Sequence, residues 1–557
     1  MIAGPKGRVY AQPQEPSQLV EAIPNKVNGV DTFPMWQVSP GVYGVDTLKQ
    51  RAGQPIVSIW GVAPGQVIRV VAVERRNDDG LPTTTKNRQD AVDSQVIGNT
   101  YVVNSDVPKP RALGQVGLLI PSAYGYGCCS PVATNPYGCG NSTPSNSFGK
   151  GTNAGATPIW DSFLHVLPYE AYRFYGDTKP AATAYAAMSQ YLKSWATYWM
   201  GAYTANADST KHYLVSSGLG DWAAPRGNPG SAVVPPGGVS DDEQAVRDNT
   251  NFSVPTIGVP SGSAYLAYMA KVTAEVAAAL GNTADEAYCK TMFENIRKDY
   301  NAKWFDASVG YYRENANQPF LQSMQAIPLG MGLVDEANRI PLMTKLVHDV
   351  LVTRHGHEEV GIAGSRWIFP ALTQAARDGV PDAAYAIALQ TTYPSYGYWV
   401  QTLGWTGIGE YWEAGSRTRT HEMYGSIVQW MYEELAGIQA ASPGFKTINI
   451  RPLILNGAGI NDVSATYKSV HSLISSAWTT NAAGITLDVT IPANTTATIF
   501  VPGTDPAKVT ESGVLASRAP GVTYVGTTLD AVKYTVGSGT YHFSTRGTAT
   551  TGGRGNK

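Results

Sequence analysis

The sequence predicts a mainly α-helical protein with flanking β structure, in which an α/α toroid lies between an N-terminal β-rich segment and a C-terminal antiparallel β-sandwich. Between about residues 155 and 440, about nine segments carry apolar residues at i, i+3, i+4 and i+7, the spacing of amphipathic helices. The flanking regions instead alternate apolar and polar residues, as half-buried strands do. Alternately short and long loops join the helical segments, which indicates helix pairs arranged in series.

We expect residues 1–105 to form the N-terminal β-rich segment. "PIVSIWGV" and "QVIRVVAVERR" are strand-like runs separated by the turn sequences "APGQ" and "NDDG". The first twenty residues lack the uninterrupted apolar stretch of a signal peptide. No apolar run in the chain reaches the roughly 18–20 residues that span a bilayer. We therefore expect no membrane partner, and the sequence is compatible with either a secreted or a cytoplasmic location.

We expect residues 106–440 to form the α/α-barrel domain. In such a barrel the loops at one end surround the mouth, so these loops are where we expect the chemistry. The helices are predicted in the following segments: "WDSFLHVLPYEAYRFYG", "PAATAYAAMSQYLKSWATYWM", "SGSAYLAYMAKVTAEVAAALG", "ADEAYCKTMFENIRKDYNAKWF", "SMQAIPLGMGLV", "IPLMTKLVHDVLVTRHG", "SRWIFPALTQAARDG", "DAAYAIALQTT" and "HEMYGSIVQWMYEELAGI".

Residues 441–545 return to a strand pattern and are predicted to form the antiparallel β-sandwich. The strands are expected in "FKTINIRP", "ITLDVTIP", "TATIFVP" and "VKYTVGSGTYHFS". The last residues, 546–557, are polar and glycine-rich, so we expect a disordered tail.

Charge and composition narrow the class of partner. The chain has 41 basic and 43 acidic residues and a formal charge of −2, and no basic stripe is visible, so we expect no nucleic-acid partner. It is rich in rings and in loop-forming residues, with 31 Tyr, 13 Trp, 58 Gly and 36 Pro. Carbohydrate-binding proteins often have this composition, because an aromatic ring stacks on the apolar face of a sugar while polar groups bind its hydroxyls.

The stretch "GWTGIGEYWEAG" at 404–415 has the composition of a sugar site. It places two carboxylates, Glu410 and Glu413, beside Trp405, Tyr411 and Trp412 in a glycine-rich loop. The glycines allow tight turns that present a carboxylate, and the rings limit solvent around it. The alternative is that Glu410 is an ordinary surface residue of a loop.

Several motifs resemble the α-L-rhamnosidases of glycoside hydrolase family 78. "HEEVGIAGSRWIFPALTQAARDG", "ALQTTYPSYGYWVQTLGWTGIGEYWEAG", "HEMYGSIVQWMYEELAGI" and "PGFKTINIRP" follow one another in the order and spacing of that family. "WDSFLHVLPYEAYRFYGD", "GLGDWAAP" and "VTIPANTTATIFVP" are also similar to it. The resemblance covers about residues 155–500 and implies a six-pair (α/α)6 helical barrel between β domains.

The resemblance also implies roles for individual residues. Family members invert the anomeric centre, so one carboxylate activates water while an acid protonates the leaving oxygen, and Glu410 is implied as the base. For each Asp or Trp of the "PIWDS" and "GLGDW" motifs the alternative is a helix N-cap or a buried ring. The implied sugar-binding residues are Trp160, Asp161, Asp221, Trp222, Trp405, Trp412, Glu413 and His421.

One departure from the family concerns the general acid. That acid lies in a segment patterned D-C-P-x-R-E-x-x-G-W-x-G-D, whereas residues 98–122 read "GNTYVVNSDVPKPRALGQVGLLIPS", without Glu or Trp. The helix count points to the same departure, because six pairs need twelve helices and the sequence shows about nine. Either the toroid is incomplete in this sequence or the protein has lost its usual acid. The carboxylates that could replace it are Asp242 and Glu243, with Asp241 beside them, and Glu358.

We expect no metal and no cofactor. His355 and His357 beside Glu358 and Glu359 mimic a metal cluster, but His357 matches a loop position of the family.

The sequence leaves two hypotheses about function. The first is an inverting exo-α-L-rhamnosidase that acts on terminal α-L-rhamnosyl residues of glycosides or polysaccharides. The second is a catalytically impaired carbohydrate-binding relative that keeps the aromatic pocket and lacks the acid.

Overall fold

The computed structural model describes the strands at 35–39, 42–45, 67–72 and 97–102 and residues 158–194, 213–215, 220–221, 223–225, 257–414, 416, 419, 421–455 and 458–546. The chain divides into two compact units. The smaller unit contains the N-terminal strands and Trp399–Glu422, and the larger one contains the helices and the C-terminal sheets.

The N-terminal strands form two antiparallel pairs. β1 (Met35–Ser39) pairs with β2 (Val42–Val45), and β3 (Val67–Ala72) pairs with β4 (Ile97–Val102). β3 lies within the predicted strand "QVIRVVAVERR", which confirms that strand. The predicted strand "PIVSIWGV" lies outside the described residues.

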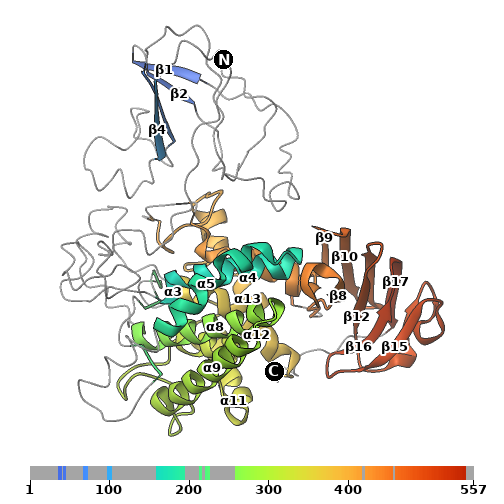
Figure 1. Ribbon diagram of the computed structural model, residues 1–557. Coiled ribbons are helices and arrows are strands. Elements are labelled where there is room, and N and C mark those ends of the chain that lie inside the picture. Colours follow the sequence, from blue (N-terminus) through green and yellow to red (C-terminus); the bar gives the residue numbers. More distant parts are fainter. Residues whose placement is uncertain are drawn as a thin grey trace. The chain divides into compact units, whose positions relative to one another are not determined.

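The helices of the larger unit follow the predicted periodic segments closely (Figure 1). Short π-helical and 3-10 segments continue some of these helices. The π-helical segment η4 (Asp349–Thr353) follows α11, η7 (Met431–Leu435) follows α14, and the 3-10 segment η6 (Glu422–Tyr424) precedes α14. The α-helices are α3 (Pro158–Asp161), α4 (Phe163–Tyr175), α5 (Lys179–Ser194), α8 (Gly258–Ala279), α9 (Thr283–Trp304), α10 (Gln322–Met331), α11 (Glu336–His348), α12 (Ile362–Arg377), α13 (Ala384–Leu389) and α14 (Ser426–Trp430).

The helix pair α8–α9 shows how the apolar pattern fixes the packing. In α9 the buried residues recur every three or four positions, so this helix buries one face only. Asn282 caps its start by accepting a hydrogen bond from Asp285 N at 3.2 Å. α8 is buried on almost all sides, because it also packs against α3, α4, α5 and α10. The largely buried α8 is therefore at the centre of the helical part.

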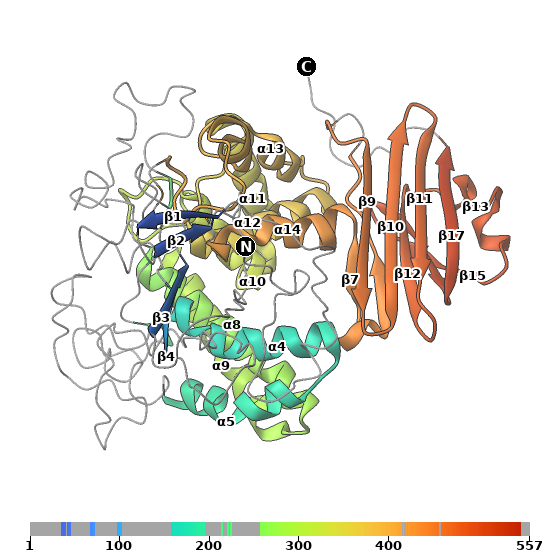
Figure 2. The same ribbon diagram turned by 90° about the horizontal axis from the view of Figure 1, so that it is seen from above.

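The C-terminal region forms two sheets that pack as the predicted β-sandwich (Figure 2). Their strand orders are β14-β13-β17-β11-β10-β9 and β15-β16-β12-β8-β7, and all pairs are antiparallel except β8–β12, which is parallel. In β11 and β12, both predicted from the sequence, alternate residues point into the core. The strands are β7 (Ile438–Ala440), β8 (Thr447–Ile450), β9 (Asp462–Ser469), β10 (Ser472–Asn481), β11 (Gly484–Ile491), β12 (Thr496–Pro502), β13 (Val509–Glu511), β14 (Val514–Leu515), β15 (Val522–Thr527), β16 (Ala531–Val536) and β17 (Gly539–Arg546).

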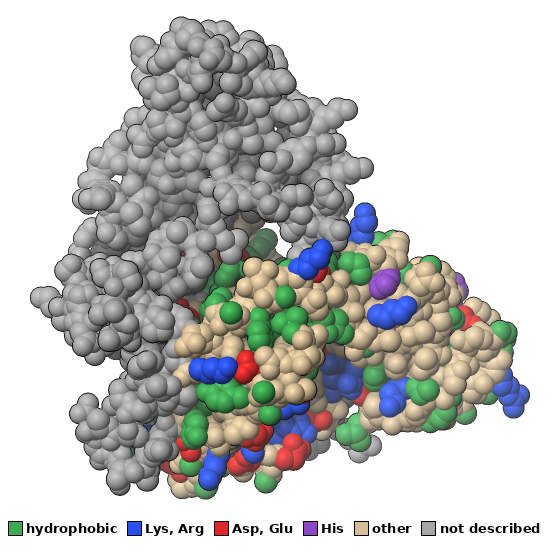
Figure 3. Space-filling model, in the orientation of Figure 1, with side chains coloured by type: hydrophobic (Ala, Val, Ile, Leu, Met, Phe, Trp, Pro, Cys, Tyr) green, Lys and Arg blue, Asp and Glu red, His purple; other side chains and the backbone are tan. Residues whose placement is uncertain are grey.

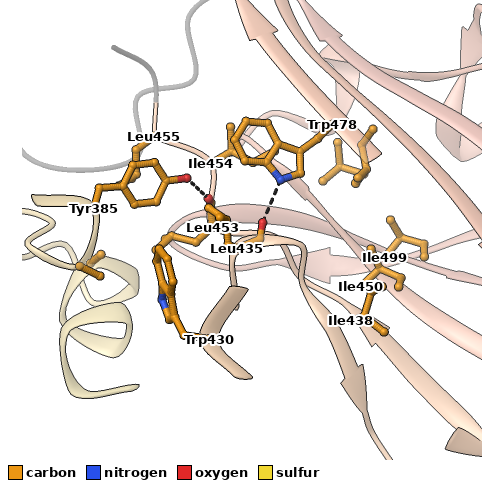
Figure 4. Packing of buried hydrophobic residues seen from close by; sticks show 14 of the residues in the cluster. Tyr385, Trp430, Leu435, Ile438, Ile450, Leu453, Ile454, Leu455, Trp478 and Ile499 are labelled. Atoms are coloured by element: carbon orange, nitrogen blue, oxygen red, sulfur yellow. Dashed lines mark hydrogen bonds between the residues drawn. The ribbon is translucent and has the colours of Figure 1, made fainter. Parts of the chain in front are cut away.

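One continuous hydrophobic core joins the sandwich to the last helices. Figure 4 shows Trp478 of β10 and Tyr385 of α13 directed at the segments that link the two parts. Trp478 Nε1 donates to the carbonyl of Leu435 at 2.8 Å, and Tyr385 Oη donates to the carbonyl of Leu453 at 2.5 Å. The helical part and the sandwich are thus held together by buried rings and hydrogen bonds.

The surface of the larger unit carries mixed charge. On the face shown in Figure 3, basic and acidic side chains lie interleaved among apolar and other groups. Within the part of the chain that is described, no helix combines the length and apolar character needed to cross a bilayer.

Candidate active site

Three stacked indole rings support the loop that contains Glu410. The ring of Trp399 stacks with those of Trp405 and Trp412, with centroid distances of 5.9 and 4.5 Å and interplanar angles of 20° and 14°. Trp399 Nε1 also donates to the carbonyl of Trp412 at 3.1 Å, and Trp405 N donates to Trp399 O at 2.8 Å. The sequence analysis did not single out Trp399, whose stacking requires the folded backbone.

Short-range hydrogen bonds close the loop around this stack. His421 N donates to the carbonyl of Ile408 at 2.8 Å, and Ser416 Oγ accepts from Tyr411 N at 3.0 Å. Gly404 has a φ of +64°, and a Cβ at Gly409 would lie 2.7 Å from the ring of Trp405. The glycines therefore permit the tight backbone path that the sequence predicted.

The two carboxylates of this loop differ in exposure. Glu410 is half-buried, whereas Glu413 is only 3% exposed. Trp405 and Trp412 are 7% and 0% exposed, so most of their ring surface is covered, and the guanidinium carbon of Arg419 lies 4.6 Å from the Trp405 centroid. The loop thus presents one accessible carboxylate, Glu410, on a framework of packed rings.

A second group of predicted site residues lies in the larger unit, at the N-terminus of α12. Asp221 Oδ2 accepts from Gly361 N at 2.6 Å and Oδ1 accepts from Gly364 N at 2.8 Å. The hydroxyl of Ser323 also donates to this carboxylate. Burial raises the pKa of Asp221, while these hydrogen bonds act in the opposite direction. The contacts correspond to the capping alternative for Asp221, and its contact with a sugar stays a prediction.

The loop before α12 contains Glu358, whose environment is unusual. Its carboxyl group is fully buried, and neither oxygen has a hydrogen-bond partner among the described residues. Burial raises its pKa to about 8, so the group is protonated at neutral pH. Burial raises the pKa of the nearby Tyr396, and the negative charge of an ionised Glu358 raises it further.

The neighbours of Glu358 are paired. Arg354 Nη2 lies 2.7 Å from Glu359 Oε2, although burial still raises the pKa of Glu359 to about 7. His357 bridges two parts of the chain, because Nδ1 lies 2.6 Å from Arg354 O and Nε2 lies 2.8 Å from Thr392 Oγ1. Gln322 accepts from Glu359 N at 2.7 Å. Within the described ranges, no cluster of three or more His, Cys, Asp or Glu could hold a metal ion.

The structure describes only some of the remaining predicted site residues. Asp161 ends α3 and is 6% exposed, and its Oδ2 accepts from Tyr191 Oη at 2.8 Å. His421 is half-buried next to η6. The side chain of Trp160 and all of Trp222, Asp242 and Glu243 lie outside the described residues.

Two family models match the chain. The model described as the bacterial α-L-rhamnosidase 6 hairpin glycosidase domain matches residues 140–435, more than half of the 557 residues. The model of the bacterial α-L-rhamnosidase C-terminal domain matches residues 437–516. These two matches meet where the helices give way to the sandwich.

Individual relatives agree with the family models. An α-L-rhamnosidase of Streptomyces avermitilis is 30% identical over 292 residues, which are 51% of this chain and 26% of that protein. The solved structure of a Streptomyces avermitilis α-L-rhamnosidase complexed with L-rhamnose has a TM-score of 0.59 at 20% identity, covering 92% of this chain and 53% of that one. An α-L-rhamnosidase structure from Dictyoglumus thermophilum gives a TM-score of 0.56 at 23% identity, covering 71% and 40%. The chain spans well under two thirds of each, and the structural likeness confirms the fold class.

Proposed function

Because the chain belongs to the bacterial α-L-rhamnosidase 6 hairpin glycosidase family, we propose that it is an inverting exo-α-L-rhamnosidase that removes terminal α-L-rhamnosyl residues from glycosides or polysaccharides. The names of its relatives and the L-rhamnose bound to one of them support this substrate. The observation that carries the proposal is the half-buried Glu410 in a loop whose Trp405 and Trp412 rings stack with Trp399.

In this mechanism Glu410 is the general base. Its carboxylate takes a proton from a water molecule, and the oxygen of that water attacks the anomeric carbon. An acid gives its proton to the glycosidic oxygen as the bond to the sugar breaks, so that rhamnose of inverted configuration and the free alcohol leave. Carboxyl groups of inverting pairs are typically about 6.5–9.5 Å apart, which leaves space for the water.

The packed rings give the base a fixed position. Residues that hold a catalytic group within a fraction of an ångström of its working geometry account for a large part of enzymatic rate enhancement. The stacked and largely covered indoles stiffen the loop that carries Glu410. We propose that Trp405 and His421 of this loop contact the sugar, and that the covered Trp412 and Glu413 hold the loop in shape. Trp160, Asp161, Asp221 and Trp222 of the larger unit stay predicted sugar contacts.

The general acid is proposed to be one of three carboxyl groups. Glu358 has the protonation state that an acid requires, because burial keeps it neutral at pH 7. It is fully covered in this structure, so donation would require a local rearrangement that exposes it. Asp242 and Glu243 are the other two candidates.

The test is a set of carboxyl-to-amide variants assayed with para-nitrophenyl α-L-rhamnopyranoside. Glu410→Gln is expected to lower kcat by roughly 10²–10⁴-fold with little change in KM, as for loss of a general base. Glu413→Gln is the matched comparison, because it changes a neighbouring carboxyl of the same loop. A larger loss for Glu413→Gln than for Glu410→Gln would assign the base to Glu413. The variants Asp242→Asn, Glu243→Gln and Glu358→Gln identify the acid. A substrate with a better leaving group needs less protonation, so it should restore activity only to the variant that lacks the acid.

A second candidate function is carbohydrate binding without hydrolysis. The absence of the family's acid-bearing segment from residues 98–122 favours it. It requires that the folded chain binds L-rhamnose in calorimetry and releases no nitrophenol. Measurable turnover that depends on Glu410 would rule it out.

A further inference from the structure

A groove of about 200 Å³ that is open to solvent lies between helices of the larger unit. Its walls come from α4, α8, α12, α14 and η7. Its polar lining includes Glu170, Arg173, Arg366, Gln429 and Glu433. We call this the α4–α14 groove. Of the sequence-predicted sugar-contacting residues that the structure describes, none lines it.

An ion-pair chain crosses the α4–α14 groove. Glu170 accepts from both arginines, from Arg173 Nε at 2.6 Å and from Arg366 Nη2 at 2.7 Å. Glu433 accepts from Arg173 Nη2 at 2.8 Å and from Gln429 Nε2 at 3.1 Å. Each of the four carboxylate oxygens therefore already accepts a hydrogen bond. The charged side chains keep 18–30% of their surface exposed, so they line the groove and remain accessible.

The hydrogen-bonding groups of this network that have no partner among the described residues are N–H donors. Arg366 uses only Nη2 in hydrogen bonds to described residues, which leaves the N–H groups of Nε and Nη1. Arg173 uses Nε and Nη2 within the described part of the chain, which leaves Nη1. Rings hold the guanidinium of Arg366 in place, with its central carbon 5.7 Å from the Tyr268 centroid and 5.5 Å from that of Trp367. The groove thus offers fixed donors to the oxygen atoms of a ligand.

The charge balance indicates a neutral ligand. Arg173 and Arg366 are offset by Glu170 and Glu433, and the fifth charged lining residue, Glu434, lies 2.7 Å from Arg377. An anion would meet the adjacent carboxylates, and a cation would find their oxygens occupied. A neutral molecule with many hydroxyl oxygens fits both limits, and Trp367 and Pro370 add an apolar part to the lining.

We propose that the α4–α14 groove is a second, non-catalytic binding site for a neutral saccharide, in which Arg366 and Arg173 donate hydrogen bonds to sugar hydroxyls. Such a site would hold part of a longer glycan, or a released sugar, away from the carboxylates of the 404–415 loop. The choice of L-rhamnose as the probe rests on the proposed function, whereas the site itself does not.

The decisive variant is Arg366→Lys. A lysine keeps the positive charge opposite Glu170 but lacks the planar donors of Nε and Nη1. Arg339→Lys is the matched control, because Arg339 pairs with Glu336 and Asp378 away from the groove. Both changes are made in the full chain carrying Glu410→Gln, and equal melting temperatures of the two show that the fold is kept.

Hydrogen-exchange mass spectrometry with L-rhamnose locates the binding. We expect slower exchange in 166–174 and 426–434 for the parent and for Arg339→Lys, with at least tenfold weaker binding for Arg366→Lys. The proposed site would be wrong if L-rhamnose slowed exchange equally in the parent and in Arg366→Lys. It would also be wrong if L-rhamnose did not slow exchange in these two segments of the parent. Protection by sulfate but not by L-rhamnose, D-glucose or D-galactose would overturn the neutral saccharide. The nitrophenyl assay is independent of these outcomes, so failure of the groove and failure of the hydrolase are distinguished.

Discussion

Asp221 Oδ2 lies 2.6 Å from the backbone nitrogen of Gly361, although the two residues are 140 positions apart in the chain. The same carboxylate accepts from Gly364 N and from the hydroxyl of Ser323 in α10. One buried side chain therefore fixes the start of α12, whose amide dipoles favour a negative charge at this end. The segment that carries His357 and Glu358 ends at this anchor.

Replacing Asp221 by alanine is expected to destabilise the fold. The change leaves the amides of Gly361 and Gly364 without an acceptor, at a cost of roughly 3 kcal/mol. Chemical denaturation of the purified variant measures it. Asp505→Ala is the control, because Asp505 caps an exposed turn by accepting from Ala507 N, and its loss should cost about 1 kcal/mol or less. Equal losses for both variants would show that Asp221 is not a buried anchor.

Glu358→Gln is expected to change how stability depends on pH. The folded-state pKa is about 8 against an ordinary value of 4.5, so between these values the folded state keeps a proton that the unfolded state releases. The stability of the parent protein should fall as pH rises through this window, by about 1.4 kcal/mol per unit of pKa difference at most. The glutamine variant lacks this loss.

Denaturation of both proteins at pH 5, 7 and 8.5 tests this expectation. The advantage of Glu358→Gln should be small at pH 5, grow at pH 7 and level off above pH 8. Glu336→Gln is the control for an ordinary carboxyl, because the Glu336 side chain is 82% exposed. An advantage that does not vary with pH would contradict a buried, protonated Glu358.

Gly437 joins η7 to β7 at a point where no other residue fits. Its φ is +79°, and a Cβ there would lie 2.2 Å from Pro452 N and 2.3 Å from Arg451 C. Gly437→Ala should therefore destabilise the protein by roughly 3 kcal/mol or more. Gly513→Ala has a similar φ of +82° with open space around it, so backbone strain alone, about 1 kcal/mol, is expected. A smaller effect at Gly437 than at Gly513 would contradict the close approach.

Trp478 tests the coupling of the sandwich to the helices. Trp478→Phe removes the hydrogen bond to Leu435 O and part of a buried ring, which should cost roughly 2–3 kcal/mol. Helix and sheet signals in circular dichroism should still fall in one shared transition at the lower temperature. Tyr524→Phe is the control, since Tyr524 is 43% exposed. Two separated transitions in the parent protein would contradict a common core.

The sequence predicted the helices well, because their apolar periodicity records which face is buried. α8 and α9 are examples, each within a few residues of its predicted segment. The hairpin of β9 and β10 was not predicted, since its Ser- and Thr-rich strands alternate only weakly in hydropathy. That hairpin is recognisable only once Ile474 and Trp478 are seen in the core.

The candidate site was predicted in its residue types more than in its geometry. The composition of the 404–415 loop pointed to Glu410 and its rings. Periodicity and composition could not show that Trp399 belongs to the stack, or that Asp221 reaches Gly361 across 140 residues. The covered carboxyl of Glu358 is likewise a result of tertiary packing, because the sequence places it in a polar loop.

The most direct test of the central claim is a proton NMR time course of para-nitrophenyl α-L-rhamnopyranoside with the full chain and with Glu410→Gln. The account expects β-L-rhamnose to appear first, before mutarotation, at a rate that falls roughly 10²–10⁴-fold in the variant. First appearance of α-L-rhamnose, or equal rates for the two proteins, would contradict an inverting mechanism with Glu410 as its base.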